Sequence, residues 1–382
     1  MATVAGGVDP ASVSTPAAVA GTAQKRPNIV LISTDDMADY DLRYMPHTRR
    51  LIGQQGATLR GFISPHPLCC PARAEILTGQ YAQNNGVRHN KGPFGGYPAL
   101  DPQHTIGTWL HDSGYQTAFV GKFLNGYEKT LEPNPGWDIF SPLVRRVYRA
   151  YGTGLLEDGY IRRYDDIYSA DLVGMKTRQY IKRFSAADKP FFIWASQVAP
   201  HQTKGKRGTW VPPVPARRHR GLFSDVQAPS VSDPAFNERN VSDKPWYIRQ
   251  SKRRSVADAN HLFRRRIRSL QAVDEAVRST VRTLKETGEL RNTVIAFTSD
   301  NGFLIGEHRF YGKNTPYEQA LQVPLLVRGP GIPVGVSRKQ TTSMIDLAPT
   351  FLQLAHARPD LPVDGRSLLP VIRRNRGGYR TS

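Results

Sequence analysis

The 382-residue sequence contains only two cysteines, Cys69 and Cys70, and they are adjacent. Because no third cysteine exists, neither can join a disulfide framework, and two thiols alone do not complete a tetrahedral zinc site. The sequence also has no run of about 18 uninterrupted apolar residues, so no membrane span is expected. These absences favour a chemical role for the cysteines over a structural one.

Acidic residues are scarce beside basic ones: 32 Asp and Glu stand against 52 Lys and Arg, which gives a formal net charge of +20. Two stretches, 204–220 and 252–268, carry much of the excess. Such runs attract a polyanion, whether nucleic acid, a sulfated glycan or an anionic membrane, and a solvated surface explains them equally well. Because no nucleic-acid module accompanies the charge and aromatics are not interleaved with it, no specific nucleic-acid partner is expected.

Composition divides the chain into three parts. Residues 1–25 are small and mostly neutral and lack a charged start, so they are expected to be a flexible leader or the remnant of an export signal. Residues 26–375 are expected to form one catalytic domain. Within it, the aperiodic Pro-, Arg- and Ser-rich segment 204–254 is expected to be a long basic loop excursion. Residues 376–382 form a tail.

Short β-branched or aromatic runs alternate with stretches of helical spacing, which predicts an α/β fold with a largely parallel central sheet flanked by helices. The expected strands are 28–34, 116–120, 191–196, 293–298 and 323–327. The expected helices are 45–55, 72–78, 105–112, 167–184 and 263–284.

Acidic or amide side chains follow two of these strands. Asp35 and Asp36 come directly after strand 28–34, and Asp300 and Asn301 follow strand 293–298 after one serine. Ligands of open α/β sheets bind outside the carboxyl ends of the strands, and hard oxygen donors favour Ca²⁺ or Mg²⁺ over zinc. An isolated Asp-Asp pair is more often a cap or a surface feature. The second cluster at a second strand end favours a divalent-cation site.

The run Cys69-Cys70-Pro71-Ala72-Arg73 matches the Cys-x-Pro-x-Arg signature of the sulfatases. The surrounding stretch 65–80, the opening strand with Asp35-Asp36 and the later segment 292–302 also resemble that family, and the resemblance spans about residues 26–370. The Lys-x-Leu-Asn run at 122–125 and the segment 323–331 resemble the glucosamine-6-sulfatase branch. The resemblance implies an alkaline-phosphatase-like sulfatase domain that hydrolyses a sulfate monoester, best guessed to be that of a sulfated carbohydrate, with aryl sulfates as assay substrates.

The resemblance also implies a role for each matching residue. Cys69 would be oxidised to formylglycine, the nucleophile, by a maturation enzyme, and Arg73 would hold the hydrated aldehyde. Lys122 and Lys313 would contact the sulfate group, and His201 and Asn125 would contact the substrate. The ligands of Ca²⁺ or Mg²⁺ would be Asp35, Asp36, residue 69, Asp300 and Asn301.

Three features depart from the family pattern. Ala72 stands where serine is most common, which leaves the Cys-Pro-Arg spacing intact. Leu124 stands where many sulfatases have a histidine, and Asn125 after it can orient an oxygen but cannot act as a base at neutral pH. The sequence ends at Ser382, so the usual small C-terminal antiparallel subdomain is expected to be missing or truncated.

Other functions stay open at this point. A phosphonate or phosphodiester hydrolase could use the same scaffold, because both esters place tetrahedral oxyanions against the same metal. A non-catalytic polyanion-binding relative could use the basic stretches alone. His308 is either a further site residue or a loop histidine. Family resemblance favours a secreted or periplasmic location, with a cytoplasmic one open.

Overall fold

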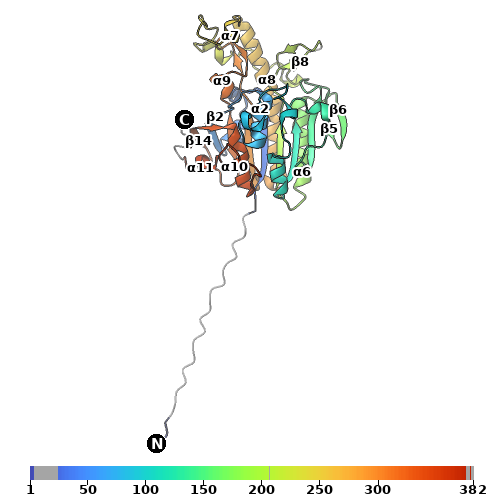
Figure 1. Cartoon of the computed structure of the whole chain (residues 1–382), viewed down its shortest axis with the longest axis vertical. Helices are drawn as coiled ribbons and strands as arrows, with labels where there is room; N and C mark the ends of the chain where they lie inside the picture. The colour runs from blue at the N-terminus through green and yellow to red at the C-terminus, as the bar shows by residue number, and fades with distance from the viewer. Residues whose placement is uncertain (4–24, 206, 376–378, 380–382) are drawn as a thin grey trace.

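A computed structural model describes residues 1–3, 25–205, 207–375 and 379. The domain that begins near residue 25 is built around one large sheet with helices on both faces (Figure 1). Most of the expected leader, residues 4–24, and of the expected tail, residues 376–378 and 380–382, lie outside the described residues.

The main sheet has ten strands in the order β14-β2-β13-β10-β1-β7-β3-β4-β5-β6. The central run from β10 to β4 is parallel, as is the pair β14 and β2, whereas β13 runs antiparallel to both of its neighbours and β4, β5 and β6 form an antiparallel meander. The sheet is therefore mixed, with a parallel centre. Its strands are β1 (Asn28–Thr34), β2 (Ala57–Ile63), β3 (Gln116–Gly121), β4 (Ile139–Arg145), β5 (Thr153–Glu157), β6 (Tyr160–Tyr164), β7 (Phe191–Ser196), β10 (Thr293–Ser299), β13 (Leu325–Arg328) and β14 (Val336–Ser343). Two small antiparallel pairs are β8 (Thr203–Lys204) with β9 (Trp210–Val211) and β11 (Leu304–Ile305) with β12 (Tyr311–Gly312).

Strand β1 lies in the centre of the sheet and is buried along its whole length. Its side chains alternate between two cores, Ile29 and Leu31 on one face and Val30 and Ile32 on the other. A parallel strand covered on both faces needs apolar residues at every position, which explains the continuous apolar run at the start of the chain.

Helices form a layer on each face of the sheet. One core includes side chains from α2, α4, α10 and α11, and the opposite core is built with α6 and α8, which pack on each other. The α-helices are α1 (Pro46–Thr48), α2 (Cys69–Thr78), α3 (Ala82–Asn85), α4 (Ile106–Asp112), α5 (Tyr127–Thr130), α6 (Ser169–Phe184), α7 (Trp246–Arg249), α8 (Val256–Glu286), α9 (Glu318–Leu321), α10 (Leu347–Ala355) and α11 (Leu369–Arg374). Short turns of other helix types are η1 (Asp39–Tyr44), η2 (Arg49–Gly53), η3 (Tyr97–Ala99), η4 (Arg217–His219), η5 (Pro229–Ser232), η6 (Glu289–Asn292) and η7 (Met344–Asp346).

The expected α/β fold is confirmed, and each predicted strand is present within two residues of its expected bounds. The helix expected at 45–55 is instead the short α1 followed by a five-residue π-turn, η2. Helix α8 begins seven residues before its predicted start, because Ser255 accepts a hydrogen bond from the Asp258 backbone N–H, 3.0 Å away, and caps it. Strands β2, β4, β5, β6 and β14 of the main sheet, and both small antiparallel pairs, were not predicted.

Segment 204–254 contains only short elements: part of β8, then β9, η4, η5 and α7. Figure 1 places β8 and α7 at the same end of the molecule. A solvated surface, one of the two explanations for the basic stretch 252–268, does not apply to Arg266. This side chain is 1% exposed, because it lies on the inner face of α8.

Among the described residues, no helix combines the length and the apolar composition needed to cross a bilayer. The last described strand is β14, which pairs with β2 inside the main sheet.

Candidate active site

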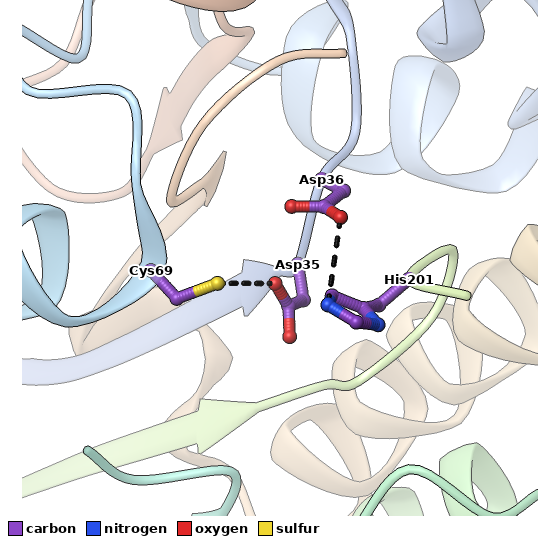
Figure 2. A group of neighbouring side chains, drawn as sticks. All are labelled: Asp35, Asp36, Cys69 and His201. Atoms are coloured by element: carbon purple, nitrogen blue, oxygen red, sulfur yellow. Dashed lines mark hydrogen bonds and ion pairs between the residues drawn. The ribbon is translucent and has the colours of Figure 1, made fainter. Parts of the chain in front are cut away.

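Cys69 is the first residue of α2, and its thiol points toward Asp35 in a buried polar cluster (Figure 2). Its thiol is 3.4 Å from Asp35 Oδ1, and the Lys313 ammonium donates a hydrogen bond to Cys69 Sγ at 2.7 Å. Burial, and then the charge of Asp35, raises the pKa of Cys69 to about 12. The unmodified thiol therefore stays protonated at neutral pH.

The two acidic clusters meet because β1 and β10 are adjacent and parallel, with Thr34 opposite Ser299. Asp300 Oδ1 accepts hydrogen bonds from the backbone N–H groups of Asp36, at 3.1 Å, and of Asn301, at 2.8 Å. Asn301 Nδ2 donates to Asp36 Oδ1 at 2.8 Å. The structure thus brings together all four oxygen-bearing residues that the sequence singles out.

Three cationic side chains surround these oxygens. Arg73, from α2, is buried and lies 3.0 Å from Asp300 Oδ2 and 3.8 Å from Asp35 Oδ2. Lys122 pairs with Asp35, and Lys313 pairs with Asp36. Lys122 follows Gly121, whose φ of +114° and closeness to the Ser196 carbonyl leave no room for a Cβ atom. The end of β3 thereby directs the lysine into the cluster.

The cations decide the ionisation of the acidic pair. Burial alone would raise the pKa values of Asp35 and Asp36. Nearby cations lower both values below their ordinary range, and the largest contribution comes from Lys122 for Asp35 and from Lys313 for Asp36. Burial and the charge of Asp35 instead raise the pKa of Asp300 to about 7. The neighbouring cations therefore keep Asp35 and Asp36 charged at neutral pH.

His201 approaches the cluster from the loop after β7 (Figure 2). Its Nε2 lies 3.7 Å from Asp36 Oδ2, and its Nδ1 is 2.7 Å from the Gln202 carbonyl oxygen. Burial lowers the pKa of His201, so the ring is neutral at pH 7. Because the carbonyl can only accept, Nδ1 carries the proton and Nε2 keeps a lone pair that faces the cluster.

The donor set fits a hard divalent cation. Ligand atoms of Asp35, Asp36, Cys69 and His201 lie within 4.8 Å of one another, and Asp300 and Asn301 are hydrogen-bonded to Asp36. Of these donors, the carboxylate and amide oxygens suit Ca²⁺ or Mg²⁺. Asn301 Oδ1 is buried and has no hydrogen-bond partner among the described residues. A buried amide oxygen without a partner is costly, and a cation bound beside Asp36 would satisfy it.

Asn125 lies at one side of this cluster. Its backbone N–H donates to Cys70 Sγ at 3.2 Å, and its side-chain oxygen accepts from the Tyr148 hydroxyl at 3.0 Å. A cavity of about 250 Å³ opens beside it, with Lys122 and Tyr148 in its wall. Leu124, in the position where many sulfatases have a histidine, also lines this cavity and offers no proton-transfer group.

Tyr148, Ser196 and Trp210 belong to this neighbourhood and were missed by sequence reasoning. The Tyr148 ring lies 4.7 Å from the His201 ring, and Ser196 Oγ lies 2.5 Å from Arg73 Nη1. Tyr148 follows β4 outside any motif, so no sequence signal places it here. Ser196 ends a predicted strand, β7, beside β1, and that strand-end position could have found it.

His308 lies outside the cluster. Its Nδ1 is 2.7 Å from Glu238 Oε2, and its ring stacks on Tyr317 with 4.2 Å between the centroids. The contact with Glu238 holds the loop after β11 against segment 204–254. His308 is therefore a loop histidine and not a member of the cluster.

The structure thus gathers buried acidic oxygens and three cationic side chains near the carboxyl ends of the central parallel strands of an α/β domain. The chain belongs to the sulfatase family, since the family model described as Sulfatase matches residues 27–357.

Individual relatives agree with this assignment. The chain is 36% identical over 388 residues to an arylsulfatase of Volvox carteri, covering 92% of this chain and 59% of that protein. It is 35% identical over 379 residues to the Homo sapiens N-acetylglucosamine-6-sulfatase, covering 93% of this chain and 65% of that one. The chain thus spans less than two thirds of either relative's length.

The fold is shared with a solved structure of BT4656 in complex with its substrate D-glucosamine-2-N,6-O-disulfate. The TM-score is 0.76 at 24% identity, and the match covers 93% of this chain and 82% of the other.

Proposed function

We propose that this protein hydrolyses a sulfate monoester of a carbohydrate to the sugar alcohol and inorganic sulfate, with residue 69 as the nucleophile after conversion to formylglycine. The observation that carries the proposal is the burial of Cys69 against Asp35 and Lys313, beside a second lysine and an arginine. Family membership supports the reaction class. The relative named N-acetylglucosamine-6-sulfatase supports the carbohydrate.

The unmodified thiol of Cys69 is unsuited to act as the nucleophile. Burial and the charge of Asp35 raise the pKa of the Cys69 thiol, so it stays protonated at neutral pH, whereas reactive cysteines have lowered pKa values. The hydrated aldehyde of formylglycine supplies two hydroxyl groups, one to attack sulfur and one whose deprotonation lets sulfate leave. We infer that a formylglycine-generating enzyme is the maturation partner of this chain, with Ala72 tolerated in its recognition motif.

The side chains around residue 69 suit an anionic substrate. Lys122 and Lys313 would neutralise sulfate oxygens, and Arg73 would orient residue 69 from its ion pair with Asp300. Fixed charges inside a water-poor site stabilise developing negative charge strongly. The neutral His201 ring would accept a hydrogen bond from a substrate hydroxyl at Nε2.

We infer that Asp35, Asp36, Asp300 and Asn301, with residue 69, would hold Ca²⁺ or Mg²⁺. Such an ion supplies a Lewis acid that withdraws charge from the sulfate oxygens. Without the ion, the charges of three carboxyl groups and three basic side chains nearly cancel. The bound ion would therefore give the site a net positive charge, which attracts the anionic ester.

The test is to co-express the chain with a formylglycine-generating enzyme and to measure the mass of the tryptic peptide containing residue 69. Sulfate release is then followed from N-acetylglucosamine 6-sulfate and from 4-nitrophenyl sulfate. Converted protein is expected to release sulfate and the Cys69→Ala variant to release none. The matched control is Cys70→Ser, because a hydroxyl oxygen can still accept the Asn125 N–H.

Full activity in protein whose Cys69 is unmodified would overturn the proposal. An aryl phosphodiester assayed in parallel decides between sulfate and phosphorus esters, and a phosphodiester preference of several orders of magnitude would favour the phosphonate or phosphodiester hydrolase. Converted protein that hydrolyses neither ester but binds sulfated glycans would favour the non-catalytic alternative.

A further inference from the structure

Trp210 is a large aromatic side chain that remains 46% exposed at the edge of the candidate active site. It lies in β9 of the β8–β9 hairpin, where Lys204 is its cross-strand partner. Its ring centroid is 5.2 Å from that of His201 and 5.2 Å from that of Tyr148, both in edge-on or steeply tilted geometry. The exposed ring therefore borders the histidine that faces Asp36.

Several contacts fix the ring in place. The Lys204 ammonium lies 4.0 Å from the Trp210 ring centroid and donates a hydrogen bond to the Gly208 carbonyl at 2.9 Å. This cation–π contact lies over the indole, and the rings of His201 and Tyr148 pack against it at steep interplanar angles. Scattered exposed apolar residues are normal on protein surfaces. The Trp210 indole is half-exposed, its contacts fix its orientation, and it lies beside the buried cluster, so it offers a preorganised binding surface.

The chemistry of a sugar ring matches this surface. One face of a pyranose presents mainly C–H groups, whose weakly positive hydrogens meet the negative face of an aromatic ring. Tryptophan supplies such area at low conformational-entropy cost because it has only two side-chain torsions. The Lys204 ammonium beside it would face an anionic substituent on the same sugar or on the next one.

We propose that Trp210 is the platform on which the sugar ring of the substrate stacks when its sulfate group lies against Lys122 and Lys313. This inference rests on the proposed function and adds the residue that would hold the sugar ring of the substrate. The sulfate would be held by charge and the sugar by stacking, so the two parts of the ligand can be tested separately.

The experiment measures binding by calorimetry in a Cys69→Ala background, where no turnover occurs. The two ligands are N-acetylglucosamine 6-sulfate and inorganic sulfate. Trp210→Ala is expected to raise the Kd of the sugar sulfate about tenfold, which corresponds to ~1.4 kcal/mol, and to change the Kd of inorganic sulfate less than about twofold. Trp210→Phe, which keeps a flat ring, is expected to recover most of the affinity.

The matched control is Tyr160→Ala, because Tyr160 is an exposed aromatic residue of the edge strand β6, away from the cluster. It should leave both affinities as they are. Equal weakening of both ligands by Trp210→Ala would mean that the indole only supports His201, and would overturn the platform. So would an unchanged affinity for the sugar sulfate, or no binding of it to the parent protein. The proposed function fails on a different observation, namely no sulfate release by converted protein that retains residue 69.

Discussion

The buried charged side chains of the cluster form ion pairs, and Lys122 shows how such a pair determines the charge of its members. Its ammonium contacts Asp35 and lies 4.9 Å from the Tyr148 ring centroid. Burial would lower the pKa of Lys122, but the charge of Asp35 raises it well above the ordinary value. The lysine therefore carries a full charge across the physiological pH range.

We predict that Lys122→Ala lowers kcat for sulfate release by about 10² to 10³, the usual cost of removing one fixed donor to a developing anion. Steady-state kinetics on converted protein measures it. Lys189→Ala, at an exposed residue before β7, is the control. A loss below about threefold would show that Lys122 pairs with Asp35 without contacting the substrate.

The Glu75 carboxyl group is buried inside α2. It is 1% exposed, and its Oε2 has no hydrogen-bond partner among the residues that the structure describes. Burial raises the pKa of Glu75 well above its ordinary value despite hydrogen bonds from the backbone of Ala82 and His66. The folded state therefore holds a proton that the unfolded state releases.

We predict that Glu75→Gln stabilises the protein more at pH 8 than at pH 5. The native pKa of the acid is raised, so the folded state binds more protons, and stability falls as pH rises from the unfolded pKa, about 4.3, toward the native one. The slope is up to about 1.4 kcal/mol per pH unit in that window. Thermal melts of both proteins across pH measure it, and a Tm difference that is constant with pH would contradict the assignment.

At the scale of elements, the first half of α8 braces the turn that follows β1. Asp36 has a φ of +70°, a conformation that is costly for a residue other than glycine. The buried Arg266 guanidinium donates to the Asp36 carbonyl oxygen and lies 2.8 Å from Asp41 Oδ2. The helix thereby holds the backbone that orients both aspartates.

We predict that Arg266→Met lowers the free energy of unfolding by about 3–5 kcal/mol, because it leaves the buried Asp41 carboxylate without its partner. Urea denaturation measures the loss. The double variant Arg266→Met/Asp41→Leu should recover part of it, since no unpaired charge then remains. If the double variant is no more stable than Arg266→Met, the loss comes from packing against Phe303 or from the hydrogen bond to the Asp36 carbonyl oxygen, and not from an unpaired charge.

Helix spacing contained the signal for Arg266, although its basic run suggested a surface. Phe263, Arg266, Ile267 and Leu270 are spaced by three, one and three residues, so they share the buried face of α8. The edge strands had weaker signals. The residues of β6 are almost all exposed, and those of β14 alternate between partly buried and exposed, so neither strand has the apolar run that marks β1.

At the scale of the whole molecule, the net charge of +20 acts on any anionic substrate before contact. Long-range attraction accelerates encounter and is screened within about 8 Å at physiological ionic strength. Part of the arginine excess does structural work: Arg264, Arg265 and Arg268 all donate through Nε to backbone carbonyls of segment 204–254. Their guanidinium charges still contribute to the electrostatic field of the protein.

We predict that kcat/KM for a sulfated polysaccharide falls at least about tenfold between 50 and 300 mM NaCl, and that the value for N-acetylglucosamine 6-sulfate falls only about twofold. A polyanion interacts with the field along its whole length, whereas a monosaccharide interacts at one point. Rates of sulfate release at constant pH measure both. Equal salt dependence would show that the basic surface does not take part in substrate capture.

The sequence by itself determined the α/β fold, because the apolar run of β1 and the helical spacing of α6 and α8 can be read residue by residue. It also determined the candidate reaction centre, since the Cys-x-Pro-x-Arg run and the residues after β1 and β10 identify themselves by type and position. Only the tertiary structure decided which side chains surround that centre. Tyr148 follows β4, Ser196 ends β7 and Trp210 lies in the separate β8–β9 hairpin, and they meet there through their contacts with His201 and Arg73. Such contacts depend on strand order and register, which no local pattern of residues specifies.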